Sequence, residues 1–67
     1  MNKFAERLQD ILKDKNISQS EFARKVSTTH QTVNRWCNGN NEPNFDMLIT
    51  ICSELDEDPN YLLGWDD

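Results

Sequence analysis

A run of polar side chains with charged and hydrogen-bonding groups occupies residues 30–38 of the chain, "HQTVNRWCN". An imidazole, two amides, a hydroxyl and a guanidinium come from His30, Gln31, Thr32, Asn34 and Arg35. Such groups can form a catalytic cluster, cover a solvated helix face, or act as donors and acceptors that recognise another molecule. Val33 and Trp36 interrupt the run at i and i+3, a spacing that places both side chains on one side of a helix.

A short helix over residues 30–37 would give this run two distinct sides. At about 100° per residue, Val33 and Trp36 point to one side, and we expect them to anchor the helix in a core. The polar groups then lie on or beside the opposite side, in chain order His30, Gln31, Asn34, Arg35 and Asn38.

Capping signals predict how this helix is connected to the one before it. The sequence "SQSE", residues 18–21, is an S-x-x-E capping box, so a helix should begin after Ser18 and extend to about Val26. The next three residues are Ser and Thr, which favour turns, and Thr29 can cap the helix over residues 30–37. We therefore expect two short helices joined by a tight link of three residues.

Three further helices are predicted on either side of this pair. The first covers residues 3–15 and ends near Asn16, a residue type that accepts a left-handed C-cap conformation. Asn44 caps a fourth helix, and Asp58 caps a short fifth helix over residues 59–63. The apolar stripes of the first and fourth helices are Phe4, Leu8, Ile11, Leu12, Leu48, Ile51, Cys52 and Leu55. No segment alternates with period two over enough residues to form a strand, so the predicted fold is all-α with five helices.

The charge of the chain is unevenly divided along its length. The formal net charge is −5, which by itself disfavours a nucleic-acid partner. Residues 1–37, however, hold all seven Lys and Arg against four acids, and residues 38–67 hold eight acids and no Lys or Arg. The halves therefore carry +3 and −8, which fits either ordinary surface solvation or a basic face with an acidic face turned away from it.

Length and composition exclude several classes of protein. Sixty-seven residues with 36% hydrophobic content make one small domain, residues 1–67, without room for a deep active-site cavity. The chain shows no signal peptide and no membrane-spanning run, and Cys37 and Cys52 match no zinc or disulfide pattern. With a single His, no paired carboxylates and no Gly-rich phosphate loop, we expect no enzyme, no metal or cofactor and no small-molecule substrate, in a cytoplasmic setting.

Two short helices joined by a tight turn form a helix-turn-helix, here about residues 18–37, whose second helix enters the DNA major groove. Arg can pair with guanine O6 and N7, Gln with adenine N6 and N7, and a Thr methyl can touch the thymine methyl. The residues predicted to read bases are His30, Gln31, Thr32, Asn34 and Arg35. The start of the helix after Ser18 can hold a phosphate through its backbone N–H groups.

At these residues the chain resembles the Cro/C1-type (XRE-like) helix-turn-helix proteins of phage and bacterial repressors. The resemblance covers "ISQSEFARKVSTTHQTVNRWCNGNNEP" and continues through "LITICSELDEDPNYLLGW". It implies a five-helix repressor-like fold, with Gln19 binding a phosphate and Asn38 reaching the DNA backbone after the recognition helix. The full set of residues expected to bind phosphate is Ser18, Gln19, Thr29, Asn38 and Asn40.

The chain departs from the family pattern in three places. Ser27 stands in the turn where the family usually has Gly. Leu12 and Cys37 occupy positions that many members fill with an Arg–Glu pair, so a packed apolar contact should replace an ion pair. The loop over residues 40–42 is Asn-Asn-Glu where the family is often basic, which predicts few charged phosphate contacts and a shallow salt dependence.

Three hypotheses of function follow. The leading one is a sequence-specific regulator of transcription, a repressor by family resemblance, that binds a pseudo-palindromic double-stranded DNA operator as a homodimer. Large apolar residues near the C-terminus suggest Tyr61, Leu62 and Trp65 as the dimer interface. The second is a protein-interaction module, similar to an antitoxin, that uses the acidic half. The third, an enzyme, lacks supporting residues.

Overall fold

The computed structural model describes residues 2–65, which form five α-helices and no strand. The helices are α1 (Phe4–Asp14), α2 (Gln19–Lys25), α3 (His30–Cys37), α4 (Phe45–Leu55) and α5 (Pro59–Leu63). Every helix boundary predicted from capping and apolar spacing agrees to within one residue. The all-α prediction is therefore confirmed for the described residues.

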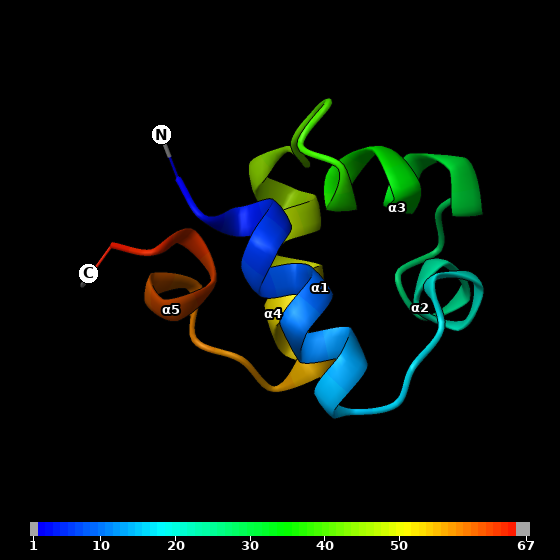
Figure 1. Ribbon diagram of the computed structural model, residues 1–67, viewed down its shortest axis with the longest axis horizontal. Coiled ribbons are helices and arrows are strands. Elements are labelled where there is room, and N and C mark those ends of the chain that lie inside the picture. Colours follow the sequence, from blue (N-terminus) through cyan, green and yellow to red (C-terminus); the bar gives the residue numbers. More distant parts are fainter. Residues whose placement is uncertain (1, 66–67) are drawn as a thin grey trace.

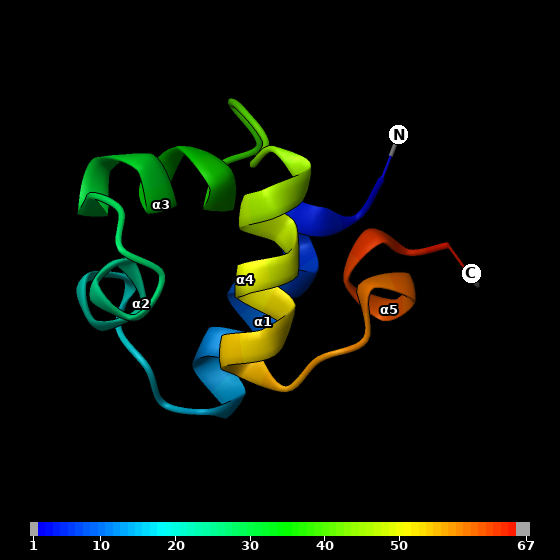
Figure 2. The ribbon, with the colours of Figure 1, turned by 180° about the vertical axis from the view of Figure 1, so that it is seen from behind.

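The helices form a central pair with smaller helices at each end. In Figure 1, α1 crosses the middle of the molecule with α4 behind it, and Figure 2 shows this pair from the other side. The helices α2 and α3 lie together at one end and α5 lies at the other. α1 packs against both α3 and α5, so it links the two ends.

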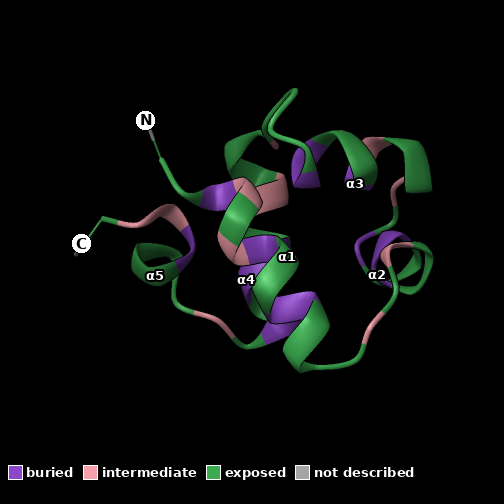
Figure 3. Cartoon of the chain, viewed as in Figure 1, coloured by how far each residue is buried: buried purple, intermediate pink, exposed green. Residues whose placement is uncertain are grey.

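The core is built from the inner side of every helix (Figure 3). The apolar stripe of α1 is buried, and the fully buried Phe22, Ile51, Leu55 and Leu62 join it from three other helices. Leu48, expected to face inward, is half-buried and packs against this cluster. Because α1 contributes to the core along its whole length, it is the support against which α3 is positioned.

Local hydrogen bonds explain why the helices begin where they do. The Ser18 hydroxyl accepts from the Glu21 N–H at 3.1 Å, and the Glu21 carboxylate accepts from the Ser18 N–H at 3.3 Å, which completes the capping box. Asn44 and Asp58 cap α4 and α5 in the same way, accepting N–H groups at 2.8 and 2.9 Å. The predicted N-caps are therefore confirmed.

Among residues 2–65, three non-glycine residues adopt a left-handed backbone after helices. Asn16 has φ = 57°, as its position after α1 predicts, and Ser27 has φ = 60° in the link between α2 and α3. Asp56 ends α4 with φ = 53°, which the sequence did not predict. Asn and Asp tolerate this conformation better than most residues, because their short polar side chains can hydrogen-bond locally.

Candidate nucleic-acid interface

The buried side of α3 is fixed to the rest of the molecule by its two predicted anchors. Val33 is fully buried and Trp36 is 3% exposed. The Trp36 ring meets the Phe4 ring of α1 edge to face, with centroids 6.5 Å apart. At the end of α3, the Gln9 side chain of α1 donates a hydrogen bond to the Cys37 carbonyl. α3 therefore has a defined orientation on α1.

The outer side of α3 presents unpartnered polar groups. His30, Gln31 and Arg35 are exposed, and none of their side chains has a hydrogen-bond or ion-pair partner among residues 2–65. α3 carries no acidic residue in its first turn that could pair with Arg35. The guanidinium and the Gln31 amide are thus open to an external partner, in the orientation that the helix spacing predicts.

The turn before α3 has a left-handed residue at the position where the resemblance predicts glycine. Ser27 has φ = 60°, and the chain is closed across it by the Thr28 N–H, which donates to the Ala23 carbonyl at 2.9 Å. A left-handed conformation costs a non-glycine residue about 1 kcal/mol. The link therefore adopts the turn that sets the angle between α2 and α3, at a small cost in stability.

Three side-chain amides form a chain of hydrogen bonds along the α2–α3 unit. The Asn38 Nδ2 donates to the Asn34 Oδ1 at 3.1 Å, and the Asn34 Nδ2 donates to the Gln19 Oε1 at 3.2 Å. Gln19 is the first residue of α2, and Asn38 is the C-cap of α3. The structure thus joins two of the residues predicted to bind phosphate through one predicted to read bases.

The predicted hydroxyl-bearing residues are occupied within their own turns. Ser18 uses both its N–H and its hydroxyl oxygen in the capping box. The Thr29 Oγ1 accepts from the Thr32 N–H at 3.1 Å and lies 2.8 Å from the Thr32 Oγ1. Thr32 is half-buried, whereas Asn40 is exposed and donates its N–H to the Arg35 carbonyl at 3.0 Å. The Ser18 and Thr29 hydroxyls therefore serve as N-caps that accept backbone N–H groups in the first turns of α2 and α3.

An apolar contact occupies the place where the resembling family often has an Arg–Glu ion pair, as the sequence predicts. Leu12 and Cys37 are both buried in the core, at 4% and 2% exposure. Burial raises the pKa of the Cys37 thiol. It also raises the pKa of Cys52, with a further contribution from the negative charges of Asp58 and Glu57. Both free thiols are therefore held in the neutral form at pH 7.

The residues predicted at a dimer interface are only partly on the surface. Leu62 is fully buried inside the molecule, so its prediction as an interface residue is wrong: a side chain enclosed by its own core cannot meet a second copy. Tyr61 is 42% exposed, and its ring packs under the Arg7 guanidinium at 4.4 Å. Trp65 is 80% exposed.

Sequence reasoning missed two exposed apolar side chains of α4. Phe45 and Ile49 are 85% and 68% exposed, and their i, i+4 spacing puts them on one face of the helix. A signal was present in the sequence, since both residues fall outside the inward stripe of α4 formed by Leu48, Ile51, Cys52 and Leu55. Phe45 also borders a hollow that Phe4, Leu48 and Leu63 line.

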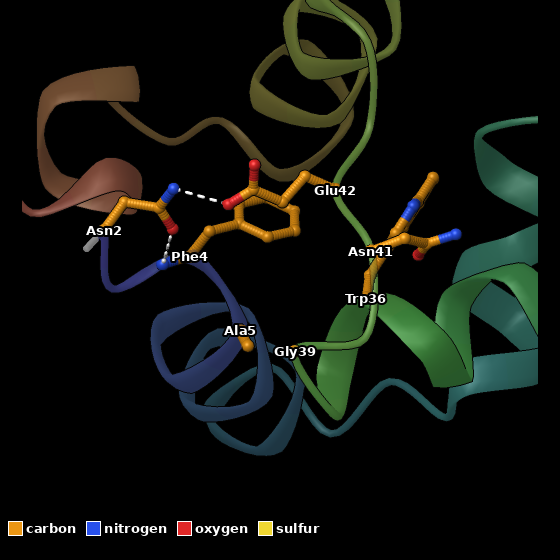
Figure 4. Close-up of a pocket in the computed structure, with 7 residues that line it drawn as sticks. All are labelled: Asn2, Phe4, Ala5, Trp36, Gly39, Asn41 and Glu42. Atoms are coloured by element: carbon orange, nitrogen blue, oxygen red, sulfur yellow. Dashed lines mark hydrogen bonds between the residues drawn. The ribbon is translucent and has the colours of Figure 1, made fainter.

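Neither a metal cluster nor a membrane-spanning helix occurs in residues 2–65. A hollow of about 150 Å³ lies between the N-terminal segment and the loop after α3 (Figure 4). Across it, the Asn2 Nδ2 donates to Glu42 at 2.6 Å, which ties the loop to the start of α1. This volume is below the range of about 300–1,000 Å³ typical of small-molecule pockets, so we assign it no ligand.

Comparisons with known proteins agree with this geometry. The crystal structure of a transcriptional regulator from Listeria innocua superimposes with a TM-score of 0.89 at 22% sequence identity, over 100% of this chain and 67% of that one. No curated protein matches the sequence. A family model described as helix-turn-helix matches residues 8–62, which is most of the chain. The chain therefore belongs to the Cro/C1-type helix-turn-helix family of DNA-binding regulators.

Proposed function

We propose that this chain is a sequence-specific transcriptional repressor that inserts α3 into the major groove of an operator. The observation that carries the proposal is the state of Gln31 and Arg35, which are exposed and unpartnered on a helix whose other side is fixed in the core. A rigid helix with free donors and acceptors is what direct readout of base edges requires. The repressing role is inferred from the family resemblance. A protein that binds operator DNA would act in the cytoplasm, which is the location we propose.

Each outward side chain has a chemically suitable partner in the groove. The Arg35 guanidinium can donate two hydrogen bonds to guanine O6 and N7, and the Gln31 amide can both donate to and accept from adenine. His30 at the N-terminal tip and the half-buried Thr32 would lie beside the same groove. Asn40, exposed after α3, would face the DNA backbone together with Gln19 and Asn38.

The repressor is proposed to act as a homodimer. Two recognition helices about 34 Å apart would read a pseudo-palindrome in successive major grooves. Support comes from the large apolar side chains that a lone molecule leaves in water, which are Phe45, Ile49, Tyr61 and Trp65. The proposed interface is thus the outer face of α4 with the segment around α5, in place of the buried Leu62.

Selection of binding sites from random duplexes tests this function. We expect enrichment of a dyad-symmetric consensus whose half-sites are separated by one helical turn, about 10 base pairs. Enrichment of a single, non-symmetric site would contradict the homodimer but keep DNA reading. If no sequence is enriched, the repressor proposal fails.

One observation favours a second candidate, an interaction module. Phe45 and Ile49 are exposed in the half of the chain that carries eight acids and no basic residue, a combination suited to a basic protein partner. The two candidates respond differently to Arg35→Ala. The substitution should remove sequence discrimination from a repressor and should leave binding to a partner at α4 unchanged.

A further inference from the structure

The chain of amides across the α2–α3 unit divides the polar residues of the interface into two kinds. The side chains of Gln31 and Arg35 have no partner among the described residues, whereas the Asn34 side chain is engaged at both ends. Its Oδ1 accepts from Asn38 and its Nδ2 donates to Gln19. Asn reads adenine by using its carbonyl and its amino group together. Both groups of Asn34 are already directed at Asn38 and Gln19, so only its second Nδ2 hydrogen and its second Oδ1 lone pair remain for an outside partner.

The direction of these hydrogen bonds fits DNA phosphates at both ends. A phosphate oxygen only accepts hydrogen bonds, so an amide that binds it must present its NH₂ group. Because the Gln19 Oε1 is occupied by Asn34, both Gln19 Nε2 hydrogens remain free to donate. Asn38 uses one Nδ2 hydrogen for Asn34 and keeps the second. If Gln19 instead donated this hydrogen bond to Asn34, one of its two Nε2 hydrogens would be used inside the protein.

We propose that Asn34 is a positioning residue that orients Gln19 and Asn38 as a pair of neutral phosphate donors. This inference depends on the proposed DNA-binding function. Asn34 bonds to Gln19 at the start of α2, fifteen residues away, and to Asn38 at the end of α3, four residues away. It would therefore couple the two contacts that these residues make with the DNA backbone. The pair supplies hydrogen bonds to the DNA backbone in a chain whose loop after α3 carries no basic residue.

The neutrality of the three amides gives a distinctive expectation for salt dependence. Binding weakens with salt in proportion to the number of phosphates that cationic side chains neutralise. A contact from a neutral amide therefore adds affinity without making the salt dependence steeper. Loss of Asn34 should weaken binding to all duplexes by the same factor and leave the slope of log K against log salt concentration unchanged.

A double-mutant cycle tests the inference. Fluorescence anisotropy would measure dissociation constants for the wild type, Asn34→Ala, Gln19→Ala and the double variant. The duplexes are the selected operator, its single-base-pair variants and an unrelated sequence, each at several salt concentrations. We expect Asn34→Ala to weaken binding about three- to tenfold on every duplex, the scale of one or two hydrogen bonds. In the Gln19→Ala background the same change should cost much less, because part of the effect acts through Gln19.

The outcomes separate this inference from the function on which it depends. Asp14→Asn, at an exposed side chain near the end of α1 and outside both proposed interfaces, is the control and should not weaken binding. Loss of discrimination at one base pair in Asn34→Ala would make Asn34 a base-reading residue and overturn the inference alone. Equal losses in both backgrounds, with a lower melting temperature, would show a merely structural role and also overturn it. If the wild type binds no duplex, both the inference and the repressor proposal fail.

Discussion

The outer faces of α3 and α4 differ in composition, although both helices bury their inner side in the same core. α3 exposes an imidazole, two amides and a guanidinium, of which His30, Gln31 and Arg35 have no partner within the described chain. α4 exposes Phe45 and Ile49 beside acidic residues. Free donors and acceptors suit a hydrated, hydrogen-bonding partner, whereas exposed aromatic and aliphatic groups suit a protein surface. The comparison therefore favours the proposals that α3 meets DNA and that α4 meets a second protein molecule.

The same division explains why net charge misrepresents this chain. A total of −5 combines a half of +3, which contains α3, with a half of −8, which contains α4 and α5. The acidic half is expected to be repelled by DNA, so it favours approach with the α3 side forward. For this small domain, the charge of each half of the sequence is therefore more informative about a partner than the sum is.

The largest expected effect contrasts the two large aromatic residues of these helices. Trp36→Ala removes the anchor of α3 from the core and should lower the free energy of unfolding by about 3–5 kcal/mol. Phe45→Ala, at a side chain that is 85% exposed, should change it by less than about 0.5 kcal/mol. Urea unfolding followed by circular dichroism measures both, at a protein concentration low enough for the proposed dimer to dissociate. Equal losses would mean that Phe45 is covered in the isolated molecule.

The next effect concerns the α4 face in the dimer. Replacing both Phe45 and Ile49 by Ser should raise the dimer dissociation constant at least about tenfold, because two large apolar groups no longer become buried. Sedimentation velocity over a concentration series measures the shift, and Gln31→Ala on the outer side of α3, outside the proposed dimer interface, is the control. A wild type that stays monomeric at high micromolar concentration would contradict the proposed interface.

A smaller effect is expected at the turn that sets α3 against α2. Ser27→Gly should raise the free energy of unfolding by up to about 1 kcal/mol, since glycine adopts φ = 60° without steric cost. Ser20→Gly, inside α2 where the backbone is helical, should lower it by about 0.5 kcal/mol. Thermal unfolding of both variants provides the comparison. A loss of stability in Ser27→Gly would show that its side chain contributes more than the strain costs.

The smallest expected effect is a difference in thiol reactivity between Cys37, which has no charged neighbour that shifts its pKa, and Cys52, which lies near acidic residues. Burial raises the pKa of both thiols from the ordinary value of 9.0, and at Cys52 the charges of Asp58 and Glu57 add to it. Salt screens those charges, so iodoacetamide should alkylate Cys52 faster at high than at low ionic strength, with no change at Cys37. Peptide mass spectrometry separates the two sites. An equal salt response at both cysteines would contradict the electrostatic contribution at Cys52.

These raised pKa values also make the stability of the fold depend on pH. Above about pH 9 the unfolded chain loses its thiol protons while the folded chain retains them, so the thiols favour unfolding as the pH rises. Urea midpoints should accordingly fall above pH 9. Replacing both cysteines by Ser should reduce this fall, because Ser does not titrate in that range.

The helices could be predicted from the sequence because their signals are local. A capping box at Ser18, an Asn-Gly at the end of α3 and a Pro after Asp58 each fix a boundary through neighbouring backbone groups. The orientation of Gln31 and Arg35 also follows from local geometry, since Val33 and Trp36 determine which side of one helix is buried. The left-handed conformation of Ser27 is suggested only by the family resemblance, which has Gly at this position of the turn.

The features that escaped prediction depend on residues distant in the chain. Whether Leu62 or Phe45 is exposed depends on how α5 and α4 pack, and hydrophobicity alone favours burial of both. The hydrogen bond between Gln19 and Asn34 joins residues fifteen positions apart, and no spacing rule pairs them. Helix spacing alone therefore places Asn34 with the base-reading residues, whereas its contacts favour a positioning role.

The central claim, that the outer side of α3 reads base edges, is tested most directly by one binding series. Gln31→Ala and Arg35→Ala would be measured against the selected operator and each of its single-base-pair variants. We expect each substitution to remove about 1–3 kcal/mol of discrimination at one base pair per half-site, and at a different base pair for the two residues. A uniform loss over all sequences, or no loss at all, would show that these side chains do not read bases.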